Sequence, residues 1–501
     1  MRIIYKSQIY NYNIMSYLIC LLVAIGVIVF FLVYGLTHST SDEHYFNYNH
    51  QLGSSEFGNS FAAASTSLAT VLFFFVILGL KNGLWILWSP ITFWIGTLFF
   101  NRVMLPHINQ QSSIIYKPEN KSLGETLGSY IQNRYNSKSV KVWIMMITLM
   151  GILSIMLIEL YVGVEIFEVF LKPDYKRYAL VVIAVVTFIY TGFGGLRAVV
   201  KTDLIQYWFM VVVAFLLVLY FGYTNYSNGV ILQNKELFPS LGIKSVPLYL
   251  NMLCVNILLI PSLLRNWQLF SAAKNEKSIR KGLKTGVKLT VFISLLFVLF
   301  GMLFFKNYGI SNDPSLLGIL DTMASSKSKM VSYVLFPALF AACLMALLST
   351  VDSSLLPIIQ CVKHDFLSKD FISKKRVARY INFALIVLVL VVTLVGYFIV
   401  FEWLGFDLVS WLFSIFGIVT ISSPAIIFAC LGKEEIIQTS IMRASIKLFT
   451  LIGVIIALGI SIFGVNMDNG DWIIQLNTPI SIIVISGCLL LIYGFVKKLH
   501  K

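Results

Sequence analysis

The chain has 501 residues, of which 58% are hydrophobic and only 12% are charged. Because a water-soluble domain carries about 25% charged residues, this composition excludes an ordinary soluble protein. The formal net charge of +15 is concentrated in short segments between apolar runs, which argues against a nucleic-acid-binding protein.

Apolar runs long enough to cross a bilayer recur along the whole sequence. About 18 or more apolar residues in a helix span a hydrocarbon core of ~30 Å, so the sequence predicts an all-α, multi-pass integral membrane protein. About thirteen transmembrane helices are expected, at residues 14–36, 58–80, 83–104, 142–171, 178–197, 203–223, 245–265, 285–305, 331–361, 380–401, 404–431, 447–466 and 478–497.

The basic residues predict the orientation of these helices. They cluster at 117–141, 265–288 and 363–379 and in the C-terminal KKLHK. With thirteen spans and an outside N-terminus, all four clusters lie on one side, as the positive-inside rule expects of the cytoplasm. We therefore expect a plasma (inner) membrane protein with a cytoplasmic C-terminus, although Arg2 and Lys6 do not fit this pattern.

The second expected span, 58–80, starts with small and hydroxyl-bearing residues and continues with three phenylalanines in succession. Small residues allow helices to pack closely in a membrane. Alternatively, this half of the span is locally unwound, and its carbonyl and hydroxyl oxygens ligate an ion. The sequence is compatible with both interpretations.

The fourth expected span, 142–171, carries Glu159 well inside the apolar run. A carboxylate in lipid normally faces a cavity or a cation. Glu159 either contacts a solute, for which an ammonium group would be suitable, or pairs with a basic residue on a neighbouring helix.

The segment Tyr190–Trp208 separates two apolar runs with three glycines and with Arg197, Lys201 and Asp203. Glycines allow two helices to turn tightly, and the basic residues hold the turn in the cytoplasm. A helix N-cap is expected at Thr202 or Asp203.

The ninth expected span, 331–361, places hydroxyl groups and one carboxylate in the middle of the membrane. The residues are Ser349, Thr350, Asp352, Ser353 and Ser354. Their oxygens suit a small hard cation rather than a transition metal. Serine and threonine can instead bond to their own helix, but an aspartate in mid-span indicates an ion site.

The segment Tyr190–Trp208 resembles the hallmark turn of the sodium:solute symporter family, Y-T-x-x-G-G-x-x-A-V-x-x-T-D-x-x-Q. Every defined position is matched, by Tyr190, Thr191, Gly194, Gly195, Ala198, Val199, Thr202, Asp203 and Gln206. Segments 45–53, 122–141, 266–282 and 347–356 (LLSTVDSSLL) also resemble the family, so the resemblance covers most of the chain.

The resemblance implies a leucine-transporter-like fold with two inverted five-helix repeats. Residues 1–57 would form an extra helix and a cytoplasmic loop, 58–223 the first repeat, 224–432 the second repeat, and 433–501 two further helices and a short basic tail. In such transporters the first helix of each repeat is broken near the bilayer midplane. In span seven, Asn251, Asn256 and Pro261 are expected to interrupt the helix.

The resemblance also implies two ion sites, with sodium as the only metal. The main site would use the carbonyls of Thr66, Ala69 and Ala346 and the hydroxyls of Ser349 and Thr350. The second ion site would use Asp203, Ser349, Asp352 and Ser353. A solute bound between spans two, four, seven and eleven is expected to contact Thr70, Phe73, Phe74, Glu159, Asn251 and Asn256.

The implied function is the import of a small organic solute with sodium, by alternating access. The residues that follow the expected ion ligands in the sequence are apolar and aromatic, whereas a sugar site needs several polar side chains, so an amino acid or a carboxylate is favoured.

A solute sensor would need an appended signalling domain, and the sequence ends shortly after the last span. A sodium-conducting channel is an alternative that could use a similar ion site. No catalytic cluster stands out, so we expect a monomeric transporter that is not an enzyme and has no cofactor besides the coupling sodium ion.

Overall fold

A computed structural model of the chain shows an almost entirely helical protein. It describes residues 14–37, 45–46, 48–111, 126–169, 176–230, 232–242, 245–309, 316–367, 375–403, 408–465 and 471–499. Within these ranges, β structure is limited to one isolated bridge between Leu52 and Ala273. The all-α prediction is confirmed. Helices suit a membrane because they pair their own backbone N–H and C=O groups, for which lipid offers no hydrogen-bond partners.

The helices of the first half of the chain include the first break described below. They are α1 (Ile14–Thr37), η2 (Tyr48–His50), α2 (Ser54–Ser65), the π-helical η3 (Ala69–Ile77), α3 (Leu78–Asn82), η4 (Gly83–Leu87), α4 (Trp88–Phe99), η5 (Phe100–Met104), α5 (Leu105–Gln111), α6 (Leu127–Tyr135), α7 (Lys138–Phe167), α8 (Lys176–Ser227) and α9 (Asn234–Leu237).

The second half supplies the second broken helix and the central helix of the bundle. Its elements are α10 (Val246–Ser262), α11 (Leu264–Ala272), α12 (Glu276–Tyr308), α13 (Leu316–Ala324), η8 (Val331–Leu335), α14 (Phe336–Cys361), η9 (Val362–Phe366), α16 (Lys375–Tyr397), η10 (Phe398–Trp403), α17 (Leu408–Thr420), α18 (Ser423–Leu431), α19 (Glu434–Ile437), α20 (Ser440–Val465), α21 (Asp471–Gln475) and α22 (Asn477–Leu499).

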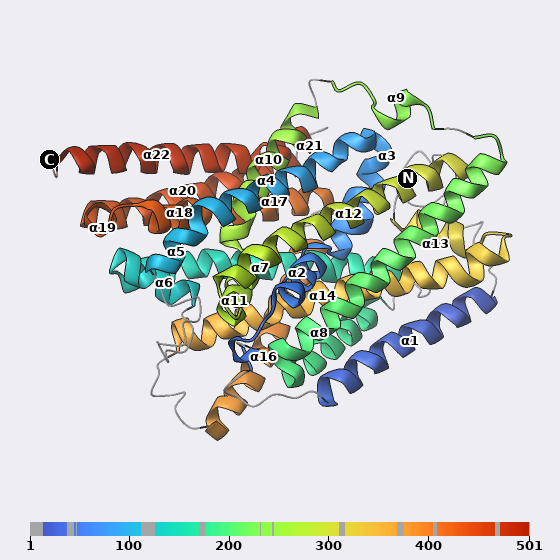
Figure 1. Ribbon diagram of the computed structural model, residues 1–501, viewed down its shortest axis with the longest axis horizontal. Helices are drawn as coiled ribbons and strands as arrows, with labels where there is room; N and C mark the ends of the chain where they lie inside the picture. Colours follow the sequence, from blue (N-terminus) through green and yellow to red (C-terminus); the bar gives the residue numbers. More distant parts are fainter. Residues whose placement is uncertain are drawn as a thin grey trace.

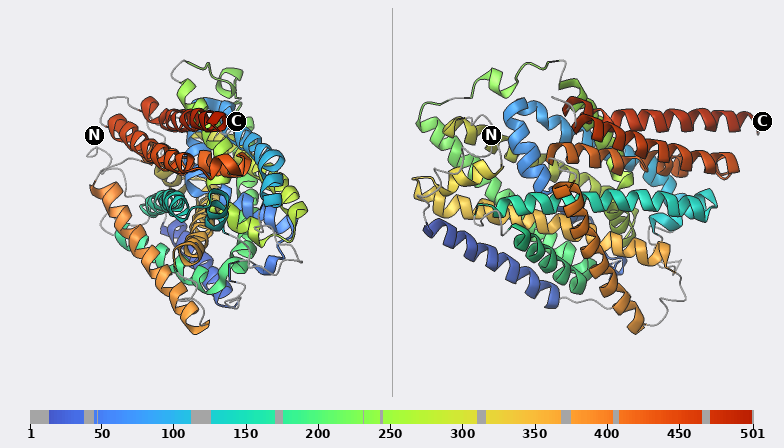
Figure 2. Two further views of the ribbon diagram at one scale, coloured as in Figure 1. Left: turned by 90° about the vertical axis from the view of Figure 1, so that its left-hand side faces the viewer. Right: turned by 180° about the vertical axis from the view of Figure 1, so that it is seen from behind.

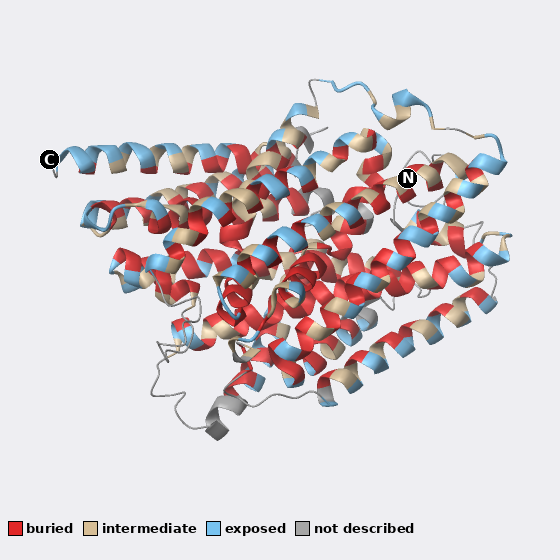
Figure 3. Ribbon diagram, viewed as in Figure 1, coloured by how far each residue is buried: buried red, intermediate tan, exposed pale blue. Residues whose placement is uncertain are grey.

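Most long helices run roughly along the longest axis of the molecule (Figure 1). Figure 2 shows α16, in orange, on the outside of this bundle and oblique to it. In the 18-residue apolar window of the span that contains α14, 89% of the residues are buried, compared with 28% in that of α1 and 33% in that of α22. Buried residues therefore gather in the middle of the bundle, and the outer helices carry exposed apolar faces that suit lipid (Figure 3).

Ten helices of the described ranges are long and apolar enough to cross a membrane, or eleven if the bent pair α10 and α11 is one span. The prediction of thirteen divides two of these runs. One is Ala69–Gln111, which leaves helical geometry at Gly83, and the other is Val181–Ser227, which does so at Gly195. The exact count stays a prediction.

Two helices are broken in mid-course, as predicted. The first break separates α2 from η3, and the second lies at Leu263, where α10 and α11 meet at 45°. The prediction that Asn251 and Asn256 interrupt the second helix is wrong, because both lie inside the continuous α10. The break instead follows Pro261, whose ring cannot donate a backbone hydrogen bond and disturbs the preceding turn.

The glycine turn predicted within Tyr190–Trp208 lies in the middle of α8. Gly195 has φ 62° and ψ −169°, a conformation that glycine adopts readily. The predicted N-cap at Thr202 or Asp203 is wrong, because Gly195 alone absorbs the turn and the helix resumes before Thr202. The Thr202 hydroxyl donates to the carbonyls of Ala198 and Val199, at 3.1 and 2.9 Å, inside that helix.

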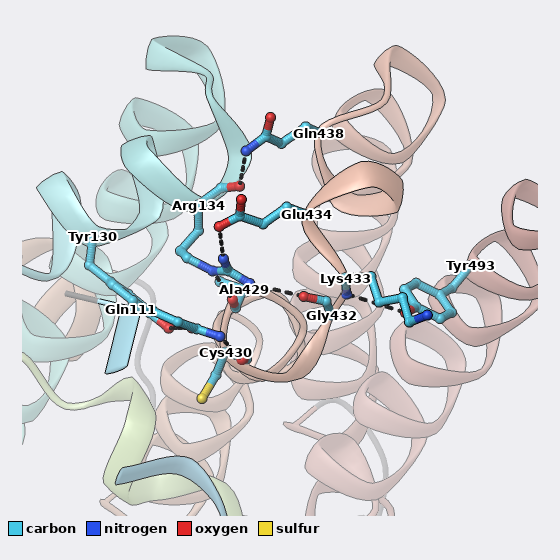
Figure 4. A network of polar contacts seen from close by, with 10 residues as sticks. All are labelled: Gln111, Tyr130, Arg134, Ala429, Cys430, Gly432, Lys433, Glu434, Gln438 and Tyr493. Atoms are coloured by element: carbon cyan, nitrogen blue, oxygen red, sulfur yellow. Dashed lines mark hydrogen bonds and ion pairs between the residues drawn. The ribbon is translucent and has the colours of Figure 1, made fainter. Parts of the chain in front are cut away.

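Arg134 of the short helix α6 forms hydrogen bonds to the end of α18, and its side chain is only 4% exposed. Its Nε donates to the carbonyl of Ala429 at 2.6 Å, and its Nη2 donates to that of Gly432 at 2.9 Å. Its Nη1 forms an ion pair with Glu434 (Figure 4). The last carbonyls of a helix lack intrahelical partners and form the negative end of its dipole, so a buried arginine suits this position.

Replacing Gly301 with Ala is expected to lower the free energy of unfolding by about 1–3 kcal/mol. A Cβ at Gly301 would lie 2.5 Å from the carbonyl oxygen of Val76, where α12 packs on η3. The matched control is Gly26→Ala in α1, where an added Cβ meets nothing within 4 Å. Thermal unfolding of the purified variants should give a lower midpoint for Gly301→Ala; equal midpoints would contradict this close packing.

Candidate functional site

The break after α2 places non-helical backbone in the middle of the bundle. Thr66 has φ −109° and ψ 67°, and its hydroxyl donates to the carbonyl of Ala62 at 2.7 Å. Its N–H donates to the carbonyl of Ala63 at 3.0 Å. The Ser67 hydroxyl then accepts the N–H of Thr70 at 3.2 Å, so small hydroxyl side chains satisfy the backbone groups that the break releases. Of the two interpretations of this span, local unwinding is confirmed.

Glu159 of α7 lies against the start of the segment that follows this break. Its carboxylate accepts the N–H groups of Leu68 and Ala69, at 3.0 and 3.4 Å. The first N–H groups of a helix lack intrahelical partners and form the positive end of its dipole. The Glu159 side chain, 1% exposed, therefore stabilises the N-terminal end of the segment after the break.

Arg265 of α11 reaches the opposite side of the same break. Its Nη1 donates to the carbonyl of Ala64, in the last turn of α2. A positive charge suits the C-terminal end of a helix, so Arg265 and Glu159 complement the two helix ends at the break. The sequence analysis missed this role, because Arg265 begins a long basic cluster. The available signal was its position only four residues after Pro261, inside the same apolar span.

The second break is held by side chains from the first turns of α11. The Trp267 indole Nε1 donates to the carbonyl of Pro261 at 2.7 Å. The Asn266 amide donates to the carbonyl of Ile260 at 3.0 Å. The carbonyls at the end of α10 thus find partners within the protein, which lipid would not offer them.

Asp203 connects three helices in the interior. Its carboxylate accepts the Ser60 hydroxyl of α2 at 2.5 Å and the Ser349 hydroxyl of α14 at 2.7 Å. All three residues are buried, and no basic side chain within the described ranges forms an ion pair with Asp203. The predicted partners Asp203 and Ser349 are brought together. Ser60 was missed, because one serine in a run of small residues gives no signal of its own.

Asp352 provides a second buried carboxylate beside the first. It accepts the hydroxyl of Tyr190 and, at 3.3 Å, the hydroxyl of Ser353. The two carboxyl groups lie close enough for like charges on them to repel each other. Two buried carboxylates are costly unless a cation or a proton compensates them, so this arrangement of carboxylates and hydroxyls suits a small hard cation.

The residues predicted for the main ion site lie on both sides of the first break. Thr66 lies in the break, and Ala69 follows it in η3. On α14, the Thr350 hydroxyl donates to the carbonyl of Ala346 at 3.0 Å, and Ser349 is bound to Asp203. Ala69 and Thr350 line one cavity, so the two halves of the predicted site are near each other, and their ligation of an ion stays a prediction.

The cavity beside the break has a volume of about 120 Å³. Residues of η3, α7, α10 and α17 line it, and these helices correspond to the four spans expected around a solute. Five of the six residues predicted to contact the solute are among the lining: Thr70, Phe74, Glu159, Asn251 and Asn256. The side chain of the sixth, Phe73, lies outside the described residues.

The asparagine amides of this cavity are already engaged with the protein. Asn251 donates to the carbonyl of Gln475 at 2.6 Å, and Asn256 donates to that of Ser89 at 2.9 Å. Most other lining side chains are apolar or aromatic. The cavity therefore suits a solute with a substantial apolar surface.

Replacing Glu159 with Gln is expected to lower the free energy of unfolding by about 1–2 kcal/mol, the cost of a lost hydrogen bond to a buried donor. One carboxylate oxygen becomes an NH₂ group, which cannot accept the N–H of Leu68 or Ala69. Thermal unfolding would be compared with that of Glu435→Gln, which changes an exposed glutamate. A Glu159→Gln midpoint equal to that of this control would show that Glu159 does not stabilise the break.

Solved structures of transporters have the same fold. A Na⁺-coupled sialic acid symporter, in a substrate-bound outward-open state, is 16% identical with a TM-score of 0.72, over 95% of this chain and 97% of that chain. A mutant of the manganese transporter of Eremococcus coleocola is 14% identical with a TM-score of 0.52, over 91% and 95% of the two chains. The nucleobase-cation-symport-1 family transporter Mhp1, in a closed conformation, is 11% identical with a TM-score of 0.51, over 90% and 94%.

No curated protein sequence matches the chain. Residues 45–427, more than half of the sequence, match the sodium:solute symporter family. This match agrees with the helical membrane bundle, its two broken helices and its buried oxygen-rich cluster. The chain therefore belongs to the sodium:solute symporter family and is a multi-pass membrane protein of the class that couples solute transport to sodium.

Proposed function

We propose that this protein imports a small organic solute, an amino acid or a carboxylate rather than a sugar, together with sodium by alternating access. The observation that carries the proposal is the contact of Asp203 with Ser60 and Ser349. This contact joins the first broken helix to α8 and α14, and both α2 and α14 also contribute residues to the cavity lining. An ion bound among these helices would stabilise one arrangement of them, and a ligand shifts a conformational equilibrium only through such a difference in affinity.

The proposed ion ligands are those expected from the sequence. The main sodium site comprises Thr66, Ala69, Ala346, Ser349 and Thr350, and the second comprises Asp203, Ser349, Asp352 and Ser353. Ser349 belongs to both sets, and its bond to Asp203 provides a direct link between them. Separation of α14 from α2 would dismantle the main site and release sodium and solute on the same side.

The choice of solute rests on the chemistry of the cavity. A sugar needs several protein groups to replace its hydrogen bonds to water. The amides of Asn251 and Asn256 are engaged with backbone carbonyls, and the remaining lining is mainly apolar. The predominance of apolar and aromatic side chains, together with the charged side chains of Glu159 and Arg265, favours a solute with an apolar body and one charged end over a sugar.

We place the protein in the plasma (inner) membrane, with the N-terminus outside and the C-terminus in the cytoplasm. The start of α7, α19 and the end of α22 lie at one end of the bundle (Figure 1). Lys138 begins α7, Lys433 directly precedes α19 and Lys497 lies in the last turn of α22, and basic residues are enriched on the cytoplasmic side of membrane proteins. One chain carries both breaks, both sets of ion ligands and the cavity, so the proposed transport unit is a monomer.

The experiment that tests this function measures thermal unfolding and uptake with the purified protein. Sodium chloride is titrated against choline chloride at constant ionic strength, because a ligand of the folded state raises stability by RT ln(1 + [L]/Kd). A rise specific to sodium is expected, together with solute uptake into proteoliposomes that requires an inward sodium gradient. Sodium flux that needs no solute would indicate a channel, and absence of any sodium effect would withdraw the ion sites.

A further inference from the structure

The cavity contains one basic side chain whose hydrogen-bonding capacity is mostly unused. A guanidinium carries five N–H donors. Within the described chain, the one polar contact of the Arg265 guanidinium is the carbonyl of Ala64. The side chain lines the cavity, so its remaining donors are available to a molecule bound there.

The acidic side chain on the same cavity is used differently. Both oxygens of Glu159 accept backbone N–H groups, those of Leu68 and Ala69. Glu159 and Asp203 interact with the charge of Arg265, but neither is within ion-pair distance of it in the described structure. Glu159 is therefore committed to the backbone, whereas the guanidinium of Arg265 has no acidic side chain within ion-pair distance among the described residues.

The surroundings of Arg265 favour an anion with an organic body. Aromatic side chains from η3, α4 and α17 line the cavity, among them Phe74, Phe93 and Phe413. Charge-assisted hydrogen bonds are strengthened where water is excluded. Arginine in particular presents a planar pair of donors that matches the two oxygens of a carboxylate.

We propose that Arg265 binds the carboxylate of the transported solute and that the substrates are small carboxylates with an apolar body. The inference rests on the proposed function and narrows its solute class. The carboxylate would lie between the two breaks, where Arg265 of α11 already contacts the end of α2. A bound solute would therefore contact both broken helices at once.

Matched acid and amide pairs test the substrate class without any mutation. The probes are butyrate and butyramide, benzoate and benzamide, and leucine and leucinamide, each added to the purified protein in sodium chloride or choline chloride. Carboxylates should raise the unfolding midpoint in sodium, and their amides should do so only at concentrations about 100-fold higher, since hydrogen bonds to charged groups are the stronger ones. Equal shifts for acid and amide, or no shift from any carboxylate, would overturn the proposal.

Variants test the residue itself. Arg265→Gln should weaken carboxylate binding about 100-fold while the midpoint shift caused by sodium alone is retained. Arg265→Lys keeps the charge without the planar pair of donors and should show an intermediate loss; it decides the question if Arg265→Gln does not fold. Arg102→Gln, which changes an exposed arginine of η5, is the control and should bind carboxylates normally.

The outcomes separate this inference from the proposed function. A protein that responds to sodium but binds carboxylates equally well in Arg265→Gln and in the wild type would overturn the role of Arg265 and leave sodium coupling intact. A wild-type protein that responds to carboxylates but not to sodium, with the carboxylate response weakened in Arg265→Gln, would support the role of Arg265 and contradict sodium coupling.

Discussion

Replacing Asp203 with Asn is expected to raise the sodium concentration needed for half-maximal uptake by about 100-fold, or about 2.8 kcal/mol of sodium binding free energy. Asp203 is buried, and hydroxyls of two other helices donate to it. The amide that replaces the carboxylate carries no charge and has one acceptor oxygen instead of two. Removing one member of a buried charge pair typically costs about 3–5 kcal/mol, so an ion compensated by Asp203 should be lost almost entirely at low sodium.

The sodium dependence of uptake into proteoliposomes measures this effect. Ser349→Ala removes one hydroxyl but no charge and should raise the sodium requirement about tenfold. The matched control is Ser354→Ala, because the Ser354 hydroxyl donates to the carbonyl of Thr350 on its own helix, at 2.7 Å. Its sodium requirement should equal that of the wild type. An unchanged requirement in Asp203→Asn would remove this carboxylate from the ion path.

The positions of the helices were largely predictable, because a helix that crosses the lipid needs a long run of apolar residues. The positions of the two helix breaks were harder to predict. In span two, the run of small and hydroxyl residues marked the region of Thr66, since such side chains can satisfy released backbone groups. In span seven, the asparagines drew attention, although a polar side chain can pack inside a continuous helix. The residue that disrupts the backbone there is Pro261.

The candidate site was predictable only where one residue type was informative by itself. Asp352 and Glu159 were recognised because a carboxylate in mid-span is rare. Their partners were not, because partners depend on how helices meet. Glu159 contacts the backbone of Leu68, 91 positions earlier, and no side-chain pattern reports a backbone N–H. Arg265 was assigned to a basic cluster for the same reason, since its contact with Ala64 lies 201 positions away.

Replacing Arg134 with Met is expected to lower the free energy of unfolding by about 4 kcal/mol. The methionine fills much of the arginine volume, so the cost comes mainly from the carbonyls of Ala429 and Gly432. Each buried carbonyl left without a donor costs about 1–3 kcal/mol, and the favourable interaction of a positive charge with the end of α18 is lost as well. Thermal and detergent-induced unfolding of the purified variant measure this change.

Two further variants show which part of the Arg134 network matters. The Glu434 side chain is 63% exposed, so Glu434→Gln removes only a surface ion pair and should cost about 0–1 kcal/mol. Arg134→Lys keeps the charge, but one ammonium group cannot occupy the positions of three guanidinium nitrogens, so its loss should be intermediate. Equal losses for Glu434→Gln and Arg134→Met would mean that the ion pair, rather than the capping of α18, holds α6 in place. α6 and α18 contribute no residue to the proposed ion sites or to the cavity lining. If Arg134 acts by capping α18, the affinities of Arg134→Met for solute and sodium should therefore stay near those of the wild type at temperatures where the variant is folded.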